Sequence, residues 1–243
     1  MDTVVDTLQD MDAELAVMAN AQFESAPYKK ILSMKLTQER VQVYILQRAY
    51  FHLNRRDCWA YVQAAAPFDV KKLIWDHERE ELAGDPERGV PDHYTLGIQE
   101  GTTVALKPGD FAATPALPGT MACCYAWIHL AKDRPWLEAL PVCAATEISN
   151  SDEICQGGGF ARRFATKMTE ELGIPLKSQA SNAEHVVLDI EHAHLLMEAA
   201  KLHVRTPEDI RQVLKGAKAT WAVERVFKGV LADAMAALPN PAK

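Results

Sequence analysis

Residues 184–192 read Glu-His-Val-Val-Leu-Asp-Ile-Glu-His and contain the pattern His-x-x-x-Asp-x-x-His. Each residue of an α-helix turns about 100°, so positions i, i+4 and i+7 lie within about 60° of one another. The side chains of His185, Asp189 and His192 are therefore predicted to share one face of a helix. The aliphatic residues between them indicate a largely buried segment. Two imidazoles and a carboxylate on such a face favour Fe(II) or Mn(II), which accept mixed nitrogen and oxygen ligands.

The sequence on both sides of this stretch has the same helical character. Apolar residues recur at helical spacing in most of the chain, whereas the alternation typical of strands is scarce. A long helix is predicted over residues 183–203. A last helix is predicted from Thr206, the N-cap, to about residue 238, with Pro207 at its first position. Other helices are predicted over residues 1–21, 37–52, 57–66, 122–130, 135–147 and 162–172, with a loop at 101–118.

The helical segments are not separated by any linker, repeat or low-complexity tract. The sequence therefore predicts an all-α fold, a single domain over residues 1–243 built from seven or eight helices. Within it we expect an N-terminal helical arm (1–34), a metal-binding core (35–205) and a C-terminal helix (206–243).

Composition restricts the class of protein. Lys and Arg number 26 against 33 Asp and Glu, and a net charge of -7 argues against a nucleic-acid partner. The chain lacks an apolar run of about 20 residues and begins without the features of a signal peptide, so we expect no membrane partner. Five cysteines without a Cys-x-x-Cys motif indicate free thiols and a cytoplasmic location.

Two further segments offer side chains that could complete a metal site. A helix that begins after Pro67 is predicted to carry His77 and Glu81 on its apolar face. His93 opens the next helical segment, which Asp92 could cap. Glu147 follows a run of small and apolar residues, where a buried carboxylate is costly unless it is paired. Helical metal proteins commonly collect ligands from several helices in this way.

Taken together, these residues resemble the heme-oxygenase-like diiron oxidases, which share their fold with heme oxygenase and the TenA and PqqC proteins. The resemblance covers about residues 35–205 and is strongest at His-x-x-x-Asp-x-x-His. It implies six metal ligands, namely Glu81, His93, Glu147, His185, Asp189 and His192. Glu78 and Glu80 compete with Glu81 for one of these positions, and we favour Glu81 because it follows the helix face.

The resemblance also implies a cofactor and a class of reaction. Two Fe(II) ions per chain, or one iron and one manganese, would activate O2 to oxidise a small amino-acid-derived, amine or carboxylic-acid substrate. Known outcomes in the family are N-oxygenation, oxidative decarboxylation and C–C cleavage, which belong to specialised metabolism. No catalytic residue is expected beyond the ligands. The fold often forms dimers, and the N-terminal helix could contribute an interface to a homodimer.

Three other functions fit parts of the sequence. A metal-free enzyme similar to TenA or PqqC would use a cysteine nucleophile or an organic ligand, but no cysteine lies beside an activating histidine. A non-enzymatic helical binding protein would leave the ligand-type residues unexplained. Heme binding would need a histidine on the first core helix, where His52 lies late and close to Arg55.

Substrate-binding residues are not identified by the pattern. Arg162 and Arg163, which follow the glycine run 157–159, could hold a substrate carboxylate, or they could be solvated surface arginines.

Overall fold

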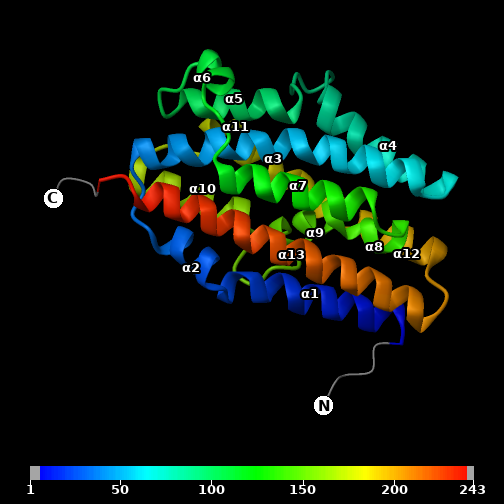
Figure 1. Cartoon of the computed structure of the whole chain (residues 1–243). Helices are drawn as coiled ribbons and strands as arrows, with labels where there is room; N and C mark the ends of the chain where they lie inside the picture. Colours follow the sequence, from blue (N-terminus) through cyan, green and yellow to red (C-terminus); the bar gives the residue numbers. More distant parts are fainter. Residues whose placement is uncertain (1–5, 240–243) are drawn as a thin grey trace.

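Helices make up most of the computed structural model, which describes residues 6–239 apart from the side chains of residues 187–191 (Figure 1). In chain order they are α1 (Leu8–Glu24), α2 (Ala26–Ser33), α3 (Gln38–Ala65), α4 (Phe68–Ala83), α5 (His93–Thr102), α6 (Pro108–Ala113), α7 (Pro118–Lys132), α8 (Trp136–Ala139), α9 (Pro141–Asn150), α10 (Phe160–Leu172), α11 (Ala180–His192), α12 (Leu195–His203) and α13 (Pro207–Ala236). A 3-10 turn at Leu176–Ser178 and a single antiparallel bridge between Asp85 and Val90 complete the regular structure of the described residues.

The two longest helices, α3 and α13, organise the molecule. Helix α7 packs against both of them, while α1 and α2 cover the opposite side of α13 (Figure 1). Helix α9 contacts α13 and α11, and α5 lies against α3 and α11. The buried side chains of Trp59, Trp127 and Trp221 come from α3, α7 and α13 and fill the core between these helices.

The predicted all-α class is confirmed, but the predicted number of seven or eight helices is too low. The helix predicted over 135–147 divides into α8 and α9, because Pro141 has no backbone N–H to continue the first helix. The helix predicted over 183–203 divides into α11 and α12. The expected loop at 101–118 contains α6, and α2 follows α1 closely where only a break was predicted.

One pair of predicted helices is instead a single helix. The segments predicted at 37–52 and 57–66 both belong to α3, which has 28 residues. The charged stretch around Arg55 and Arg56 suggested an interruption, but both side chains point into the protein, where Arg55 is buried and Arg56 pairs with Glu81. Tertiary contacts therefore keep polar residues inside this helix.

Local signals place His93 at the start of α5. Asp92 is the N-cap, and its carboxylate accepts a hydrogen bond from the Thr95 backbone N–H at 2.9 Å. Gly84 ends α4 with a φ of +67°, and a Cβ atom at this position would lie 2.2 Å from the Val90 carbonyl oxygen. The chain can therefore turn back tightly after α4 and return His93 to Glu81.

We expect Gly216→Ala to destabilise the protein by about 1–3 kcal/mol, the range typical of overpacking. Gly216 lies on α13 against α8, and an added Cβ would be 1.9 Å from the Glu138 carbonyl oxygen. Urea unfolding followed by circular dichroism measures the change. Gly229→Ala on the same helix is the control, since its Cβ would meet only Pro27, at 3.8 Å. That variant should gain up to about 1 kcal/mol from helix propensity, so equal losses in both variants would contradict the close helix contact.

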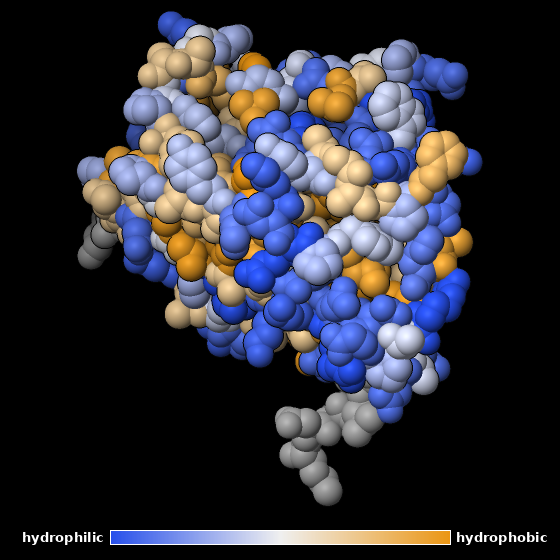
Figure 2. Space-filling view, turned by 45° about the vertical axis from the view of Figure 1, so that its right-hand side comes forward, coloured by the Kyte–Doolittle hydropathy of each residue, from blue (hydrophilic) through white to orange (hydrophobic). Residues whose placement is uncertain are grey.

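The surface mixes polar and apolar side chains. Figure 2 shows hydrophobic residues interspersed with hydrophilic ones on the face in view. Phe68, Trp75 and Leu82 are exposed at intervals of seven residues and so share the outer side of α4. Within residues 6–239, no helix combines the length and apolar character needed to cross a bilayer.

Candidate metal centre

Glu81 on α4 lies at the centre of a buried cluster of ligand-type side chains. Its Oε1 atom is 2.9 Å from His93 Nδ1 on α5 and 3.8 Å from His192 Nδ1 on α11. Its Oε2 atom is 2.8 Å from Arg56 Nη1 on α3. Three consecutive helices and the distant α11 therefore converge on one carboxylate.

His77 adds a second imidazole beside Glu81. His77 and Glu81 lie one turn apart on α4, and donor atoms of His77, Glu81 and His192 lie within 4.8 Å of one another. His77 Nε2 and His192 Nδ1 are buried, yet neither has a hydrogen-bond partner among the described residues. A buried polar atom without a partner is unfavourable, and a bound cation would satisfy both nitrogens. This set of two imidazoles and a carboxylate fits an iron ion.

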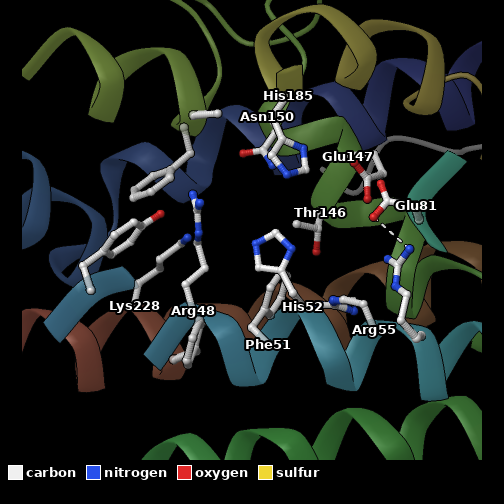
Figure 3. A pocket seen from close by; sticks show the side chains of 15 residues that line it. Arg48, Phe51, His52, Arg55, Glu81, Thr146, Glu147, Asn150, His185 and Lys228 are labelled. Carbon is white, nitrogen blue, oxygen red and sulfur yellow. Dashed lines mark ion pairs between the residues drawn. The ribbon is translucent and has the colours of Figure 1, made fainter. Parts of the chain in front are cut away.

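Two more of the predicted ligands, His185 and Glu147, lie near the cluster around Glu81. The His185 ring on α11 is 4.8 Å from the His93 ring, measured between centroids. Glu147 on α9 is buried and lines one cavity together with Glu81 and His185 (Figure 3). The structure thus brings together five of the six predicted ligands. The sixth, Asp189, lies on α11, but its side chain is outside the described residues. The metal-ligand role of all six remains a prediction.

The imidazoles of His52, His77 and His185 are neutral at neutral pH. Burial and the neighbouring His93 lower the pKa of His185 to about 4. Burial lowers the pKa of His77 well below its usual value, and the adjacent His192 acts in the same direction. Burial and the charge of Arg48 also lower the pKa of His52 well below its usual value. Neutral imidazole is the form that binds a metal, so these side chains would not have to lose a proton first.

The three competing carboxylates of α4 occupy different places. Glu78 contacts Arg56 at 2.9 Å and His77 Nδ1 at 3.1 Å. Glu80 lies 3.2 Å from His192 Nε2, and its side chain is 37% exposed. Of these three carboxylates, only that of Glu81 has an oxygen within 4.8 Å of ring nitrogens of both His77 and His192. The geometry therefore favours Glu81 as the ligand.

The charge state of two of these carboxylates points the same way. Burial raises the pKa of Glu78 to about 8. Burial also acts to raise the pKa of Glu81, but Arg56 and His93 outweigh it and hold that pKa well below its usual value. A metal ligand must be deprotonated, as Glu81 is at neutral pH.

His77 is not among the metal ligands predicted from the sequence, and His52 is not predicted to lie near the site. His77 carried a usable signal, since it precedes Glu81 by four residues on the same helix face. His52 was discounted because of its position, but in the uninterrupted α3 it lines the cavity, with its ring centroid 5.7 Å from that of His185.

The two arginines considered as a carboxylate clamp lie elsewhere. Arg162 pairs with Asp152 at 2.7 Å. Arg163 donates to the Gly158 carbonyl oxygen at 2.7 Å and lies over the Phe23 ring. Neither side chain lines the cavity that holds Glu81 and Glu147.

Solved structures share this arrangement of helices. A domain of unknown function with a heme oxygenase-like fold from Shewanella denitrificans has a TM-score of 0.72 at 14% identity, covering 95% of this chain and 92% of that chain. A CADD-like protein of unknown function from Nostoc punctiforme has a TM-score of 0.67 at 19% identity, covering 93% and 97%. A TenA homologue from P. horikoshii has a TM-score of 0.55 at 17% identity, covering 91% and 99%. At these identities the likeness shows the fold alone.

Comparison of the sequence with protein families is more specific. No curated protein matches the chain. A family model described as iron-containing redox enzyme matches residues 42–225, a range that includes every ligand-type residue described above. The chain therefore belongs to the family of iron-containing redox enzymes with a heme-oxygenase-like fold.

Proposed function

We propose that the protein is a non-heme diiron oxidoreductase that uses O2 to oxidise a small amine, amino-acid-derived or carboxylic-acid substrate. The observation that carries this proposal is the convergence of His77, Glu81 and His192, with two buried imidazole nitrogens that lack hydrogen-bond partners in the described part of the chain. Membership of an iron-containing family supports the choice of metal.

We assign the predicted residues Glu81, His93, Glu147, His185, Asp189 and His192 to the metal centre and add His77. Bound ferrous iron would supply the electrons that reduce O2. Other side chains of the protein would orient the ligands and balance their charge. Glu80 lies 3.2 Å from His192 Nε2 and can orient that imidazole, as carboxylates beside metal-binding histidines commonly do. Arg56 balances the charge of Glu81 and also contacts Glu78.

Anaerobic titration with Fe(II) tests the proposal. We expect two equivalents to bind per chain, followed by Fe-dependent O2 consumption when air-saturated buffer is added. Failure to bind iron while the circular dichroism spectrum remains helical would refute the proposal. Binding of a single equivalent would refute the diiron assignment while keeping an iron enzyme.

The described cysteines argue against the metal-free alternative that uses a thiol nucleophile. All five are buried, and burial raises the pKa of Cys123 and Cys124 to about 11 and that of Cys155 to about 12. Burial also raises the pKa of Cys143, whereas a hydrogen bond with Cys143 lowers that of Cys58. Since the thiolate is the nucleophile, four of the five thiols are suppressed by their surroundings and Cys58 is inaccessible.

We therefore expect the folded protein to keep its Fe-dependent O2 consumption after treatment with iodoacetamide at pH 8. At that pH a thiol of pKa 11 is ionised only in about one molecule in a thousand. Mass spectrometry should find little alkylation in the folded protein and five modified cysteines after unfolding in urea, which serves as the control. Loss of activity together with modification of one cysteine would favour the TenA-like chemistry.

A further inference from the structure

The cavity that reaches Glu81 and Glu147 has a second end of opposite charge. Lys228 on α13 lines that end (Figure 3). Its amine lies over the ring of Phe160, which in turn packs near the ring of Tyr44. The carboxylates and His185 lie at the other end. A molecule in this cavity would therefore meet the metal-binding side chains at one end and a cation at the other.

Lys228 is a buried amine that makes no ion pair with any described residue. It is 8% exposed, and its Nζ atom lies 3.7 Å from the centre of the Phe160 ring. Glu224, one turn earlier on α13, is itself buried and favours the charged amine. Burial lowers the pKa of Lys228 to about 8, so the amine is mostly charged at neutral pH. Buried charges are usually paired. Lys228 has the favourable charge of Glu224 nearby but no ion pair with a described carboxylate, and it lines the cavity.

A second cation of the cavity is also without a carboxylate. Arg55 is 3% exposed and lies over the rings of Phe51 at 4.4 Å and Trp127 at 4.6 Å. It donates to the Val142 carbonyl oxygen, while its Nε and Nη2 atoms have no hydrogen-bond partner among the described residues. The charge of Arg48, and to a smaller extent that of Arg55, lowers the pKa of the Lys228 amine further.

Arg48, which also lines the cavity, differs from these two residues. It pairs with buried Glu100 at 3.2 Å and donates to Ser181 Oγ at 2.7 Å. Its charge is therefore balanced within the protein. Lys228 is therefore the cation at this end of the cavity that has no ion pair with a described residue, whereas Arg55 lies nearer the Glu81 end (Figure 3).

We propose, resting on the function proposed above, that this end of the cavity binds the carboxylate of the substrate, with Lys228 as the principal contact. The cavity measures about 50 Å³. That is room for roughly four water-sized groups, so the substrate is a short carboxylate. Its carboxylate faces away from Glu81 and Glu147, and the group that is oxidised lies at the far end of the molecule. The carboxylate itself does not bind the metal.

Propionate, a short carboxylate of this size, is the probe, and the metal-free protein is the material. Isothermal titration calorimetry should detect propionate binding, and Lys228→Met should raise the dissociation constant at least about ten-fold. Lys228→Arg should retain most of the affinity, because it keeps the charge. Lys218→Met is the matched control, an exposed lysine of the same helix, and should bind propionate like the unmodified chain. Propylamine is the ligand control, and its binding should not weaken in Lys228→Met.

Loss of Lys228 also leaves Glu224 buried beside an apolar side chain, which could unfold the protein. The double variant Lys228→Met/Glu224→Gln removes both charges and should fold while still failing to bind propionate. Equal propionate affinity in this variant and the unmodified chain would overturn the proposal. So would propionate binding that requires Fe(II) and ignores Lys228, since the carboxylate would then bind the metal.

These measurements separate the two proposals. Lys228-dependent propionate binding in a protein that takes up no iron would refute the diiron function and keep the carboxylate site. Iron uptake with O2 consumption, but without Lys228-dependent propionate binding, would refute the carboxylate site and keep the diiron function.

Discussion

Glu81→Gln should abolish Fe(II) binding at the candidate centre and lower Fe-dependent O2 consumption at least about 100-fold, since even the outer partners of metal ligands often matter 10–100-fold. Glu81 is the carboxylate that lies near His93, His192 and Arg56 together. Glutamine has nearly the same shape, so the helices should remain intact, but its neutral amide is a poor replacement for an anionic ligand. Anaerobic Fe(II) titration and an oxygen electrode measure the two effects.

Glu78→Gln is the matched control on the same helix. Because burial raises the pKa of Glu78 to about 8, its carboxyl group is mostly protonated at pH 7, and an amide changes its charge little. We expect this variant to lose much less iron affinity and O2 consumption than Glu81→Gln, because a neutral amide can still contact His77 Nδ1 as Glu78 does. A loss in Glu78→Gln as large as that in Glu81→Gln would transfer the ligand position to Glu78.

Arg48→Met should cost about 3–5 kcal/mol of unfolding free energy, the loss typical of breaking a buried ion pair. Glu100 is fully buried, and its Oε1 atom lies 3.2 Å from Arg48 Nη2. The Oε2 atom of Glu100 accepts a hydrogen bond from the Asn182 backbone N–H at 2.7 Å. The pair thus links α3 and α5 to the start of α11, and removing Arg48 would leave Glu100 charged and unpaired in the core. Urea unfolding followed by circular dichroism measures the loss.

Two variants test this interpretation. Arg48→Met/Glu100→Leu removes both charges and should recover much of the lost stability, because buried ion pairs replaced by apolar residues are often neutral in effect. Arg211→Met breaks an exposed pair with Glu208 on α13 and should change stability by less than about 1 kcal/mol. A loss in Arg48→Met no larger than that in Arg211→Met would show that the buried pair does not hold the helices together. The pair matters for function because α5 begins with His93 and α11 carries His185 and His192.

Much of the candidate centre could be predicted because its signals are local. The helical spacing of His185 and His192, the capping of α5 by Asp92 and the N-cap at Thr206 all depend on residues within two turns. Metal chemistry then suggested which carboxylates on other helices should accompany them. The structure brings Glu81 and Glu147 to the same cavity, as that reasoning required.

Other features could not be predicted, because they depend on contacts between distant segments. The charged stretch at Arg55 and Arg56 looked like the end of a helix, yet Arg56 has its partner Glu81 on α4 and Arg55 lies over Trp127 of α7. The place of His52 in the cavity follows from this continuity of α3. Arg162 looked suited to a substrate, but Asp152, ten residues earlier, pairs with it.

By itself the sequence determined the all-α class, the caps that start α5 and α13, and a helix face with ligand-type histidines. Each of these follows from backbone geometry and side-chain spacing over a few residues. Only the tertiary structure decided that His77 joins Glu81 and His192, that Arg48 pairs with Glu100, and that Lys228 lines the cavity without an ion pair to a described residue. The physical reason is that the burial and charge balance of a side chain are set by whichever helices pack around it, and those helices come from distant parts of the chain.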